Sequence, residues 1–157
     1  MKKRIFIGIV IYILFSNISI FGNEKRLGLG ISLFYPTGIT FKYKWDQKMS
    51  IESTIGVSGQ GGHFHAGILY DFYNINKDFK LYTGGAFLME ERKKKKKIFR
   101  GIFEETKSFY PGVRAPFGFV YYGNNSFDVF AEISINLLAK DGMDGFLGIA
   151  IGIRAYL

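Results

Sequence analysis

The sequence predicts an all-β fold, an up-and-down antiparallel barrel of eight strands that follow one another in chain order. Along most of the chain, apolar residues alternate with small or polar ones at a period of two, the pattern of a strand whose two faces differ. No stretch beyond residue 26 keeps the 3.6-residue period of a helix. Strands without intervening helices pair as hairpins, and an even number of eight is compatible with closure into a small barrel.

Each expected strand places an apolar face opposite a mixed one. In the first, Leu27, Leu29, Ile31, Leu33 and Tyr35 form the apolar face. The fifth does not sort into two faces, and Pro116 is unusual inside the sixth because proline cannot donate to a sheet ladder. The eight expected strands cover residues 27–35, 38–45, 51–58, 63–73, 79–89, 113–122, 127–137 and 146–157.

The composition narrows the class of protein. The chain has 157 residues, enough for one domain. Its 20 glycines show no Gly-X-Y period and accompany only 3 prolines, which excludes collagen, and a hydrophobic content of 48% excludes disorder. With 0 cysteines, a disulfide scaffold, a thiolate zinc site and a catalytic cysteine are excluded.

The first residues have the pattern of a secretory signal peptide. Lys2, Lys3 and Arg4 precede the apolar run Ile5–Phe15. As a helix this run is about 16 Å long, short of the ~30 Å hydrocarbon core of a bilayer. We therefore expect a signal peptide over residues 1–22, cleaved after Gly22, and a barrel domain over residues 23–157.

The chemistry of the two faces predicts which one is inside. The apolar face carries no charge in the assigned strands, and the mixed face combines glycines with fewer charges than a solvated barrel surface carries. Short turns on the side of the termini and a longer segment on the other side are typical of transmembrane barrels. We therefore expect a transmembrane barrel with a lumen filled by paired charges. The expected lumen charge network is Lys42, Lys44, Glu52, His63, His65, Asp71, Arg114, Glu132 and Arg154, with Asp128 on the same face.

Two further features fit a membrane barrel. Tyr35, Trp45, Tyr70 and Tyr121 fall near strand ends on the apolar face, where interfacial aromatic girdles lie. The chain end is similar to an outer-membrane assembly signal read by the barrel-assembly machinery, although it ends in leucine where an aromatic residue is usual. The residues of this expected signal are Ile153, Ala155, Tyr156 and Leu157.

The formal net charge of +8 is concentrated in two places. Three cations belong to the expected signal peptide, and the segment from Glu90 to Lys107 has a net charge of +4. We expect an outer loop over residues 90–109 that contacts a host protein or a polyanionic glycan, with a passive solvated loop as the alternative. We expect no nucleic-acid binding, because the aromatic residues lie on the membrane face. The expected contact residues are Arg92, Lys93, Lys94, Lys95, Lys96, Lys97 and Arg100.

Several short motifs and their order along the chain resemble a family of small outer-membrane barrel proteins known from spirochaetes and other Gram-negative-type bacteria. That family is similar in architecture to the transmembrane domain of outer-membrane protein A. The resemblance implies an eight-stranded barrel in contact with outer-membrane lipid, with surface loops that meet host or environmental molecules and no catalytic residues. The motifs are Pro36–Thr40, Lys42–Trp45, Leu81–Gly85, Gly112–Gly118, Val129–Glu132 and Gly152–Tyr156.

Other functions stay open at this point. His63 and His65 share a face of one strand and, with Asp71, could hold a metal ion or act as a base, but we expect a hydrogen-bonded lumen cluster. We expect no enzyme, cofactor or metal, since no nucleophile motif such as Gly-x-Ser-x-Gly occurs. We expect a monomer with a plugged lumen. The alternatives are a narrow ion channel and a soluble, lipocalin-like exported barrel that binds a small hydrophobic ligand.

Overall fold

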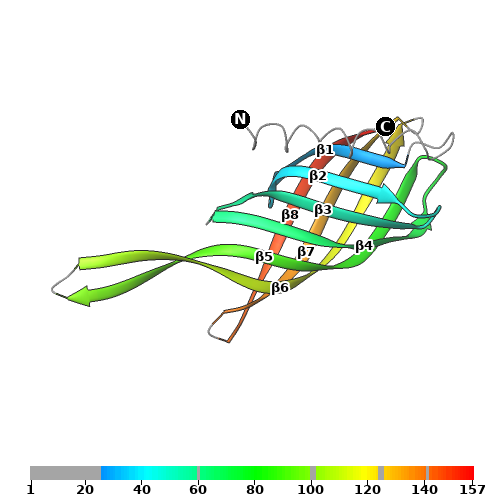
Figure 1. Cartoon of the computed structure of the whole chain (residues 1–157). Helices are drawn as coiled ribbons and strands as arrows, with labels where there is room; N and C mark the ends of the chain where they lie inside the picture. The colour runs from blue at the N-terminus through cyan, green and yellow to red at the C-terminus, as the bar shows by residue number, and fades with distance from the viewer. Residues whose placement is uncertain (1–25, 60, 100–101, 124–125, 141) are drawn as a thin grey trace, which may run out of the picture.

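Eight strands form a closed antiparallel barrel in chain order, with β8 pairing back to β1 (Figure 1). The computed structural model describes residues 26–59, 61–99, 102–123, 126–140 and 142–157, without the side chains of 94–99 and 102–106. The predicted all-β, eight-stranded barrel is confirmed. The expected signal peptide over residues 1–22 lies outside the described residues.

All eight predicted segments contain a strand. Among the described residues, no helix is long and apolar enough to cross a membrane. The strands are β1 (Leu27–Phe34), β2 (Thr37–Lys44), β3 (Met49–Ser58), β4 (Gly61–Asn74), β5 (Phe79–Phe99), β6 (Ile102–Gly123), β7 (Phe127–Ala139) and β8 (Met143–Tyr156).

Tight turns close the end of the barrel that holds the chain terminus. The amide of Leu157 donates to the carbonyl of Leu27 at this end, over 2.9 Å. In the turn after β2, the carboxylate of Asp46 accepts from the amides of Lys48 and Met49, at 2.7 and 2.6 Å. Asn76 does the same after β4, so each turn supplies its own acceptor for backbone amides. We call this end the termini end and the opposite one the hairpin end.

The barrel wall is apolar outside and polar inside. Outward side chains such as Ile31 and Ile149 are 52% and 57% exposed, whereas the inward side chains of Lys42 and Arg154 are 1% and 0% exposed. Glycines on the inner face leave room for large neighbours. A Cβ added to Gly118 would lie 2.8 Å from the ring of Tyr82, too close for the ring to stay.

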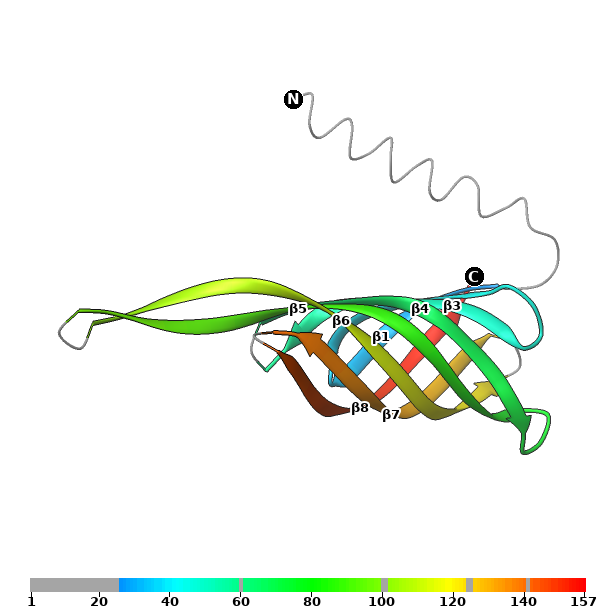
Figure 2. The same ribbon diagram turned by 90° about the horizontal axis from the view of Figure 1, so that it is seen from below.

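The β5–β6 hairpin is the longest feature of the molecule and extends beyond the barrel wall, as Figures 1 and 2 both show. Backbone pairing continues to Phe99 and Ile102. The expectation of a loop over residues 90–109 is therefore wrong, because this segment is the outer part of two paired strands. The register sets Lys95 opposite Glu105, and cross-strand pairs of opposite charge favour a strand ladder.

The register of the fifth strand is settled by its neighbours. Pairing with β6 runs from Thr83 opposite Phe117 to Ala86 opposite Arg114, without bridges between them. Pro116 lies in this interval and has no amide proton to donate, which explains the interrupted ladder. The alternation of inward and outward side chains nevertheless continues through the gap. Tyr82, next to the gap, points inward with 0% exposure.

Two tyrosines lie on the face opposite to the predicted one. Phe34 has a φ of 76° and is 68% exposed, so the alternation breaks there and the following Tyr35 turns into the lumen. Tyr35 is therefore not a girdle residue. In β4 a bulge between Asp71 and Tyr73 shifts the register, and Tyr73, predicted on the mixed face, is 57% exposed outside.

Candidate functional site

The polar side chains of the lumen form three connected clusters. The termini-side cluster is centred on Arg154, which is fully buried. Its Nε donates to Oδ1 of Asp128 over 2.9 Å, and its Nη1 lies 3.1 Å from Oε2 of Glu52. The guanidinium also lies over the ring of Phe130, 4.1 Å from the centroid. One cation is thus held between two carboxylates from different strands.

Two lysines and two tyrosines extend this cluster toward the termini end. Nζ of Lys42 donates to the hydroxyl of Tyr122 over 2.9 Å. The hydroxyl of Tyr156 donates to Oδ2 of Asp128 over 2.6 Å. Nζ of Lys44 lies over the rings of Tyr122 and Tyr156, 4.3 and 4.0 Å from their centroids. The ammonium groups therefore rest on aromatic faces as well as near carboxylates.

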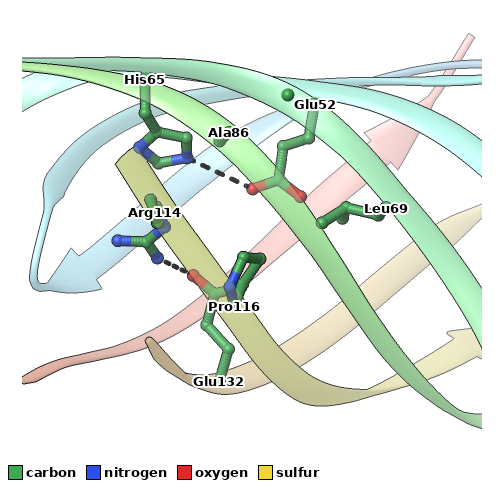
Figure 3. Close-up of a pocket in the computed structure, with 8 residues that line it drawn as sticks. Glu52, His65, Leu69, Ala86, Arg114, Pro116 and Glu132 are labelled. Atoms are coloured by element: carbon green, nitrogen blue, oxygen red, sulfur yellow. Dashed lines mark hydrogen bonds and ion pairs between the residues drawn. The ribbon is translucent and has the colours of Figure 1, made fainter. Parts of the chain in front are cut away.

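The middle cluster joins β5, β6 and β7, and Figure 3 shows its pair Arg114 and Glu132. Arg114 pairs with Glu132, which also accepts a hydrogen bond of 2.8 Å from the hydroxyl of Tyr82. Asn136 accepts from Nη1 of Arg114 over 3.4 Å. The cavity beside these groups measures about 10 Å³, room for one water molecule at most. It is lined by Glu52, His65, Gly67, Leu69, Ala86, Arg114, Pro116 and Glu132.

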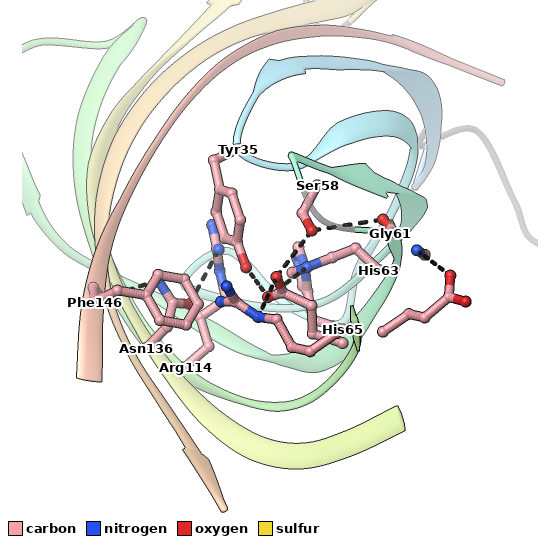
Figure 4. Close-up of polar contacts among 12 residues, drawn as sticks. Tyr35, Ser58, Gly61, His63, His65, Arg114, Asn136 and Phe146 are labelled. Atoms are coloured by element: carbon pink, nitrogen blue, oxygen red, sulfur yellow. Dashed lines mark hydrogen bonds and ion pairs between the residues drawn. The ribbon is translucent and has the colours of Figure 1, made fainter. Parts of the chain in front are cut away.

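The hairpin-side cluster is built around Glu90, and Figure 4 shows Tyr35, Ser58 and His63 of this cluster. The Glu90 carboxylate accepts from the hydroxyl of Tyr35 and, over 2.8 Å, from Oγ of Ser58. Nε of Arg92 lies 3.0 Å from the carboxylate, and Nδ1 of His63 lies 3.7 Å from it. Arg92 is only 8% exposed, so its predicted place among exposed contact residues is wrong.

The two histidines link the clusters. Nε2 of His63 lies 3.0 Å from Nδ1 of His65, and Nε2 of His65 lies 3.8 Å from Oε1 of Glu52. Asp71 does not join them, because it lies six residues from His65 along β4, about 20 Å. It contacts Nζ of Lys80 instead, at 3.4 Å. In the described part of the chain, no three His, Cys, Asp or Glu side chains come together as a metal site.

Sequence reasoning missed several members of these clusters. Tyr82 belongs to the expected fifth strand, whose faces did not sort. Glu90 and Arg92 were assigned to the expected outer loop, and Tyr35 follows the break at Phe34. Tyr122 and Tyr156 lie on the predicted mixed face, so the alternation itself could have found them.

The base of the hairpin carries the described part of the basic segment. Lys93 is exposed, and Nζ of Lys107 lies 3.2 Å from Oε1 of Glu91. The other Glu91 oxygen accepts a hydrogen bond from the amide of Gly62 over 2.9 Å. For Lys94, Lys95, Lys96 and Lys97 only the strand backbone is described, and Arg100 lies outside the described residues.

The remaining predicted positions are on the outer face or at the chain end. Trp45 and Tyr70 are exposed, and Tyr121 packs with Phe79 on the outside, at 4.7 Å between ring centroids. Ile153 and Leu157 point outward, 47% and 53% exposed. Of the expected assembly signal, Ala155 is also outward and Tyr156 is inward.

A closed eight-stranded barrel with an apolar exterior and a charged lumen defines the fold of small outer-membrane barrels. The chain is similar in structure to the N-terminal β-barrel domain of OprF from Pseudomonas aeruginosa. The TM-score is 0.63, the identity is 9%, and the likeness covers 85% of this chain and 98% of that chain. It is also similar to neisserial surface protein A, with a TM-score of 0.55, 13% identity, and coverage of 84% of this chain and 94% of that one.

Both of these proteins are eight-stranded outer-membrane barrels. The chain matches no protein-family model, and no curated protein matches its sequence. At such low identities the likeness shows the fold alone.

Proposed function

We propose that this protein is an integral outer-membrane barrel that displays the β5–β6 hairpin at the cell surface as a contact element. The observation that carries the proposal is the inverted wall, apolar outside and charged inside. Leaving a leucine or isoleucine exposed to water costs about 1.5–3 kcal/mol relative to burial. Outward residues such as Ile133 and Ile153, 55% and 47% exposed, recur on every strand of the wall and fit lipid as their surroundings.

Strand length and closure support the same environment. A tilted strand of about 9–11 residues crosses a membrane, and β7 and β8 have 13 and 14 residues. Closure leaves no unpaired strand edge in the barrel wall, which is consistent with a monomer. Export through residues 1–22 and recognition of the chain end by the assembly machinery belong to this proposal.

For the lumen we propose a plug without a catalytic role. Arg154, Arg114 and Glu90 each contact partners on other strands, so the groups that would line a pore are engaged with one another. A soluble barrel for a small hydrophobic ligand would need an apolar cavity, whereas the groups named here are charged. An ion channel is the second candidate. It predicts single-channel conductance in planar bilayers that changes when Glu52 or Arg114 is neutralised.

Membrane fractionation with an electrophoretic mobility test addresses the main proposal. We expect the protein in the outer-membrane fraction, resistant to carbonate extraction, with a folded band that shifts on boiling. Release by carbonate without detergent would contradict membrane integration, and an unchanged band would contradict a detergent-resistant barrel.

The contact role of the hairpin has its own test. Replacing Lys93–Lys97 with glutamines removes five cations, so binding to a sulfated glycan such as heparin should fall, with a smaller difference at high salt. Binding is measured on immobilised heparin at several ionic strengths. Equal retention of the two proteins at every salt concentration would leave the hairpin as a passive extension.

A further inference from the structure

The outward face of the β5–β6 hairpin changes from apolar to basic over a short distance. Phe87 is paired with Val113, and these side chains are 49% and 56% exposed. Farther along the same face, Glu91 is paired with Phe109, which is 60% exposed. The next pair on this face joins two lysines, Lys93 and Lys107. These outward residues form a stripe along the hairpin that is apolar at Phe87 and Val113 and basic at Lys93 and Lys107.

With Phe109 placed at the outer edge of the hydrocarbon core, the lysine pair lies at the level of the lipid headgroups. Same-face pairs follow one another every two residues, about 6.8 Å along a strand. With a strand tilt of about 35–45°, the lysine pair stands about 5 Å above Phe109 along the membrane normal. The headgroup region adds roughly 5–8 Å on each side of the hydrocarbon core. Ammonium groups at this level can reach lipid phosphates while Phe109 still contacts acyl chains.

Lys107 of this pair is held in place from below. Lys107, whose side chain is 61% exposed, contacts Glu91, and Glu91 is fixed by the amide of Gly62 at the start of β4. The site thus places the lysine pair above an apolar stripe, with the Glu91 carboxylate orienting Lys107 from below.

We propose that Lys93 and Lys107 bind the phosphate of an anionic lipid in the outer leaflet, with its acyl chains along Phe109, Phe87 and Val113. This inference rests on the proposed membrane location. A soluble polyanion would use the lysines alone, whereas the apolar side chains below them on the same face add a surface that fits acyl chains. The bound lipid would anchor the base of the hairpin at the membrane surface.

Native mass spectrometry of the refolded full-length barrel in detergent tests the site. Phosphatidic acid and phosphatidylcholine with identical acyl chains are titrated separately, and the ratio of their apparent affinities is the readout. The variant K93Q/K107Q should lower the preference for phosphatidic acid about thirtyfold, since each of the two lysines at a membrane surface contributes on the order of 1 kcal/mol. The control K48Q/K77Q removes the same charge from exposed turns at the termini end and should keep the preference.

The outcomes distinguish failure of the proposed lipid site from failure of the proposed membrane location. An unchanged preference in K93Q/K107Q, or an equal loss in the control, would overturn the site. Glycerol phosphate that binds as tightly as the lipid would also overturn it, because the acyl chains would then have no part. All variants should keep the mobility shift on boiling. Failure of the unaltered protein to insert into vesicles would instead overturn the proposed membrane location.

Discussion

The two ends of the lumen surround their buried charged groups with different partners. At the termini end, the basic side chains of Arg154 and Lys42 are almost fully buried among carboxylates and tyrosines. At the hairpin end, the carboxylate of Glu90 is held mainly by neutral hydroxyls, with Arg92 and a histidine beside it. A buried ion pair is costly to break, because the partner left behind cannot reach water. The termini-side cluster should therefore tolerate charge removal least.

The largest effect should follow from Arg154→Met. The change leaves Glu52 and Asp128 without their shared cation, and breaking such a buried pair costs about 3–5 kcal/mol of unfolding free energy. Urea unfolding in lipid vesicles, followed by tryptophan fluorescence of Trp45, measures the loss. Neutralising both carboxylates in R154M/E52Q/D128N should restore much of it. A loss below about 1 kcal/mol in R154M would contradict the central role of this cation.

A smaller loss is expected in the middle cluster. Arg114→Met removes the cation beside Glu132, but the hydroxyl of Tyr82 still donates to that carboxylate. We expect about 2–3 kcal/mol, the range of a hydrogen bond to a charged group. The same unfolding assay compares R114M with R114M/Y82F, and the double variant should lose more than the single one. Equal stability of the two would mean that Tyr82 does not compensate.

The hairpin-side cluster should lose less again. Glu90→Gln keeps an acceptor for Tyr35 and Ser58 while removing the charge that faces Arg92. We expect a loss of about 1–2 kcal/mol. Glu91→Gln, on the outside of the same strand, is the matched control and should change the unfolding free energy less. A larger effect at Glu91 would reverse the assignment of the inner face.

The smallest effect concerns the turns at the termini end. Hydrogen bonds from the amides of Lys48 and Met49 lower the pKa of Asp46 below its usual value. A lowered pKa in the folded state adds stability that is present above the usual aspartate pKa and is lost as pH falls through the folded value. Asp46→Asn should therefore flatten the dependence of unfolding free energy on pH below about pH 4.

The neighbouring turn offers a reciprocal control for Asp46. Asn76 accepts hydrogen bonds from the amides of Asp78 and Phe79 in the same way. Asn76→Asp should therefore add the dependence of unfolding free energy on pH that Asp46→Asn removes. Parallel curves of unfolding free energy against pH for both variants and the unaltered protein would contradict a contribution of these turns to the pH dependence.

Where local alternation is unbroken, the sequence is sufficient to assign faces. Arg114 and Arg154 were predicted in the lumen from parity alone and lie there with 3% and 0% exposure. The failures have identifiable causes. A positive φ at Phe34 turned Tyr35 inward, and a bulge turned Tyr73 outward. The lysine run on β5 predicted a loop instead of a continuing strand pair, because the opposite charges that favour the pairing lie on β6.

By itself, the sequence determined the class of fold, the eight strands and the two unlike faces, because side chains alternate across a strand whatever its neighbours are. Only the tertiary structure decided which charges meet. Lys42 and Tyr122 are 80 residues apart in the chain, and Tyr35 and Glu90 are 55 apart. These contacts depend on closure of the barrel and on the register of every strand between them. Each strand's own pattern carries no information about either.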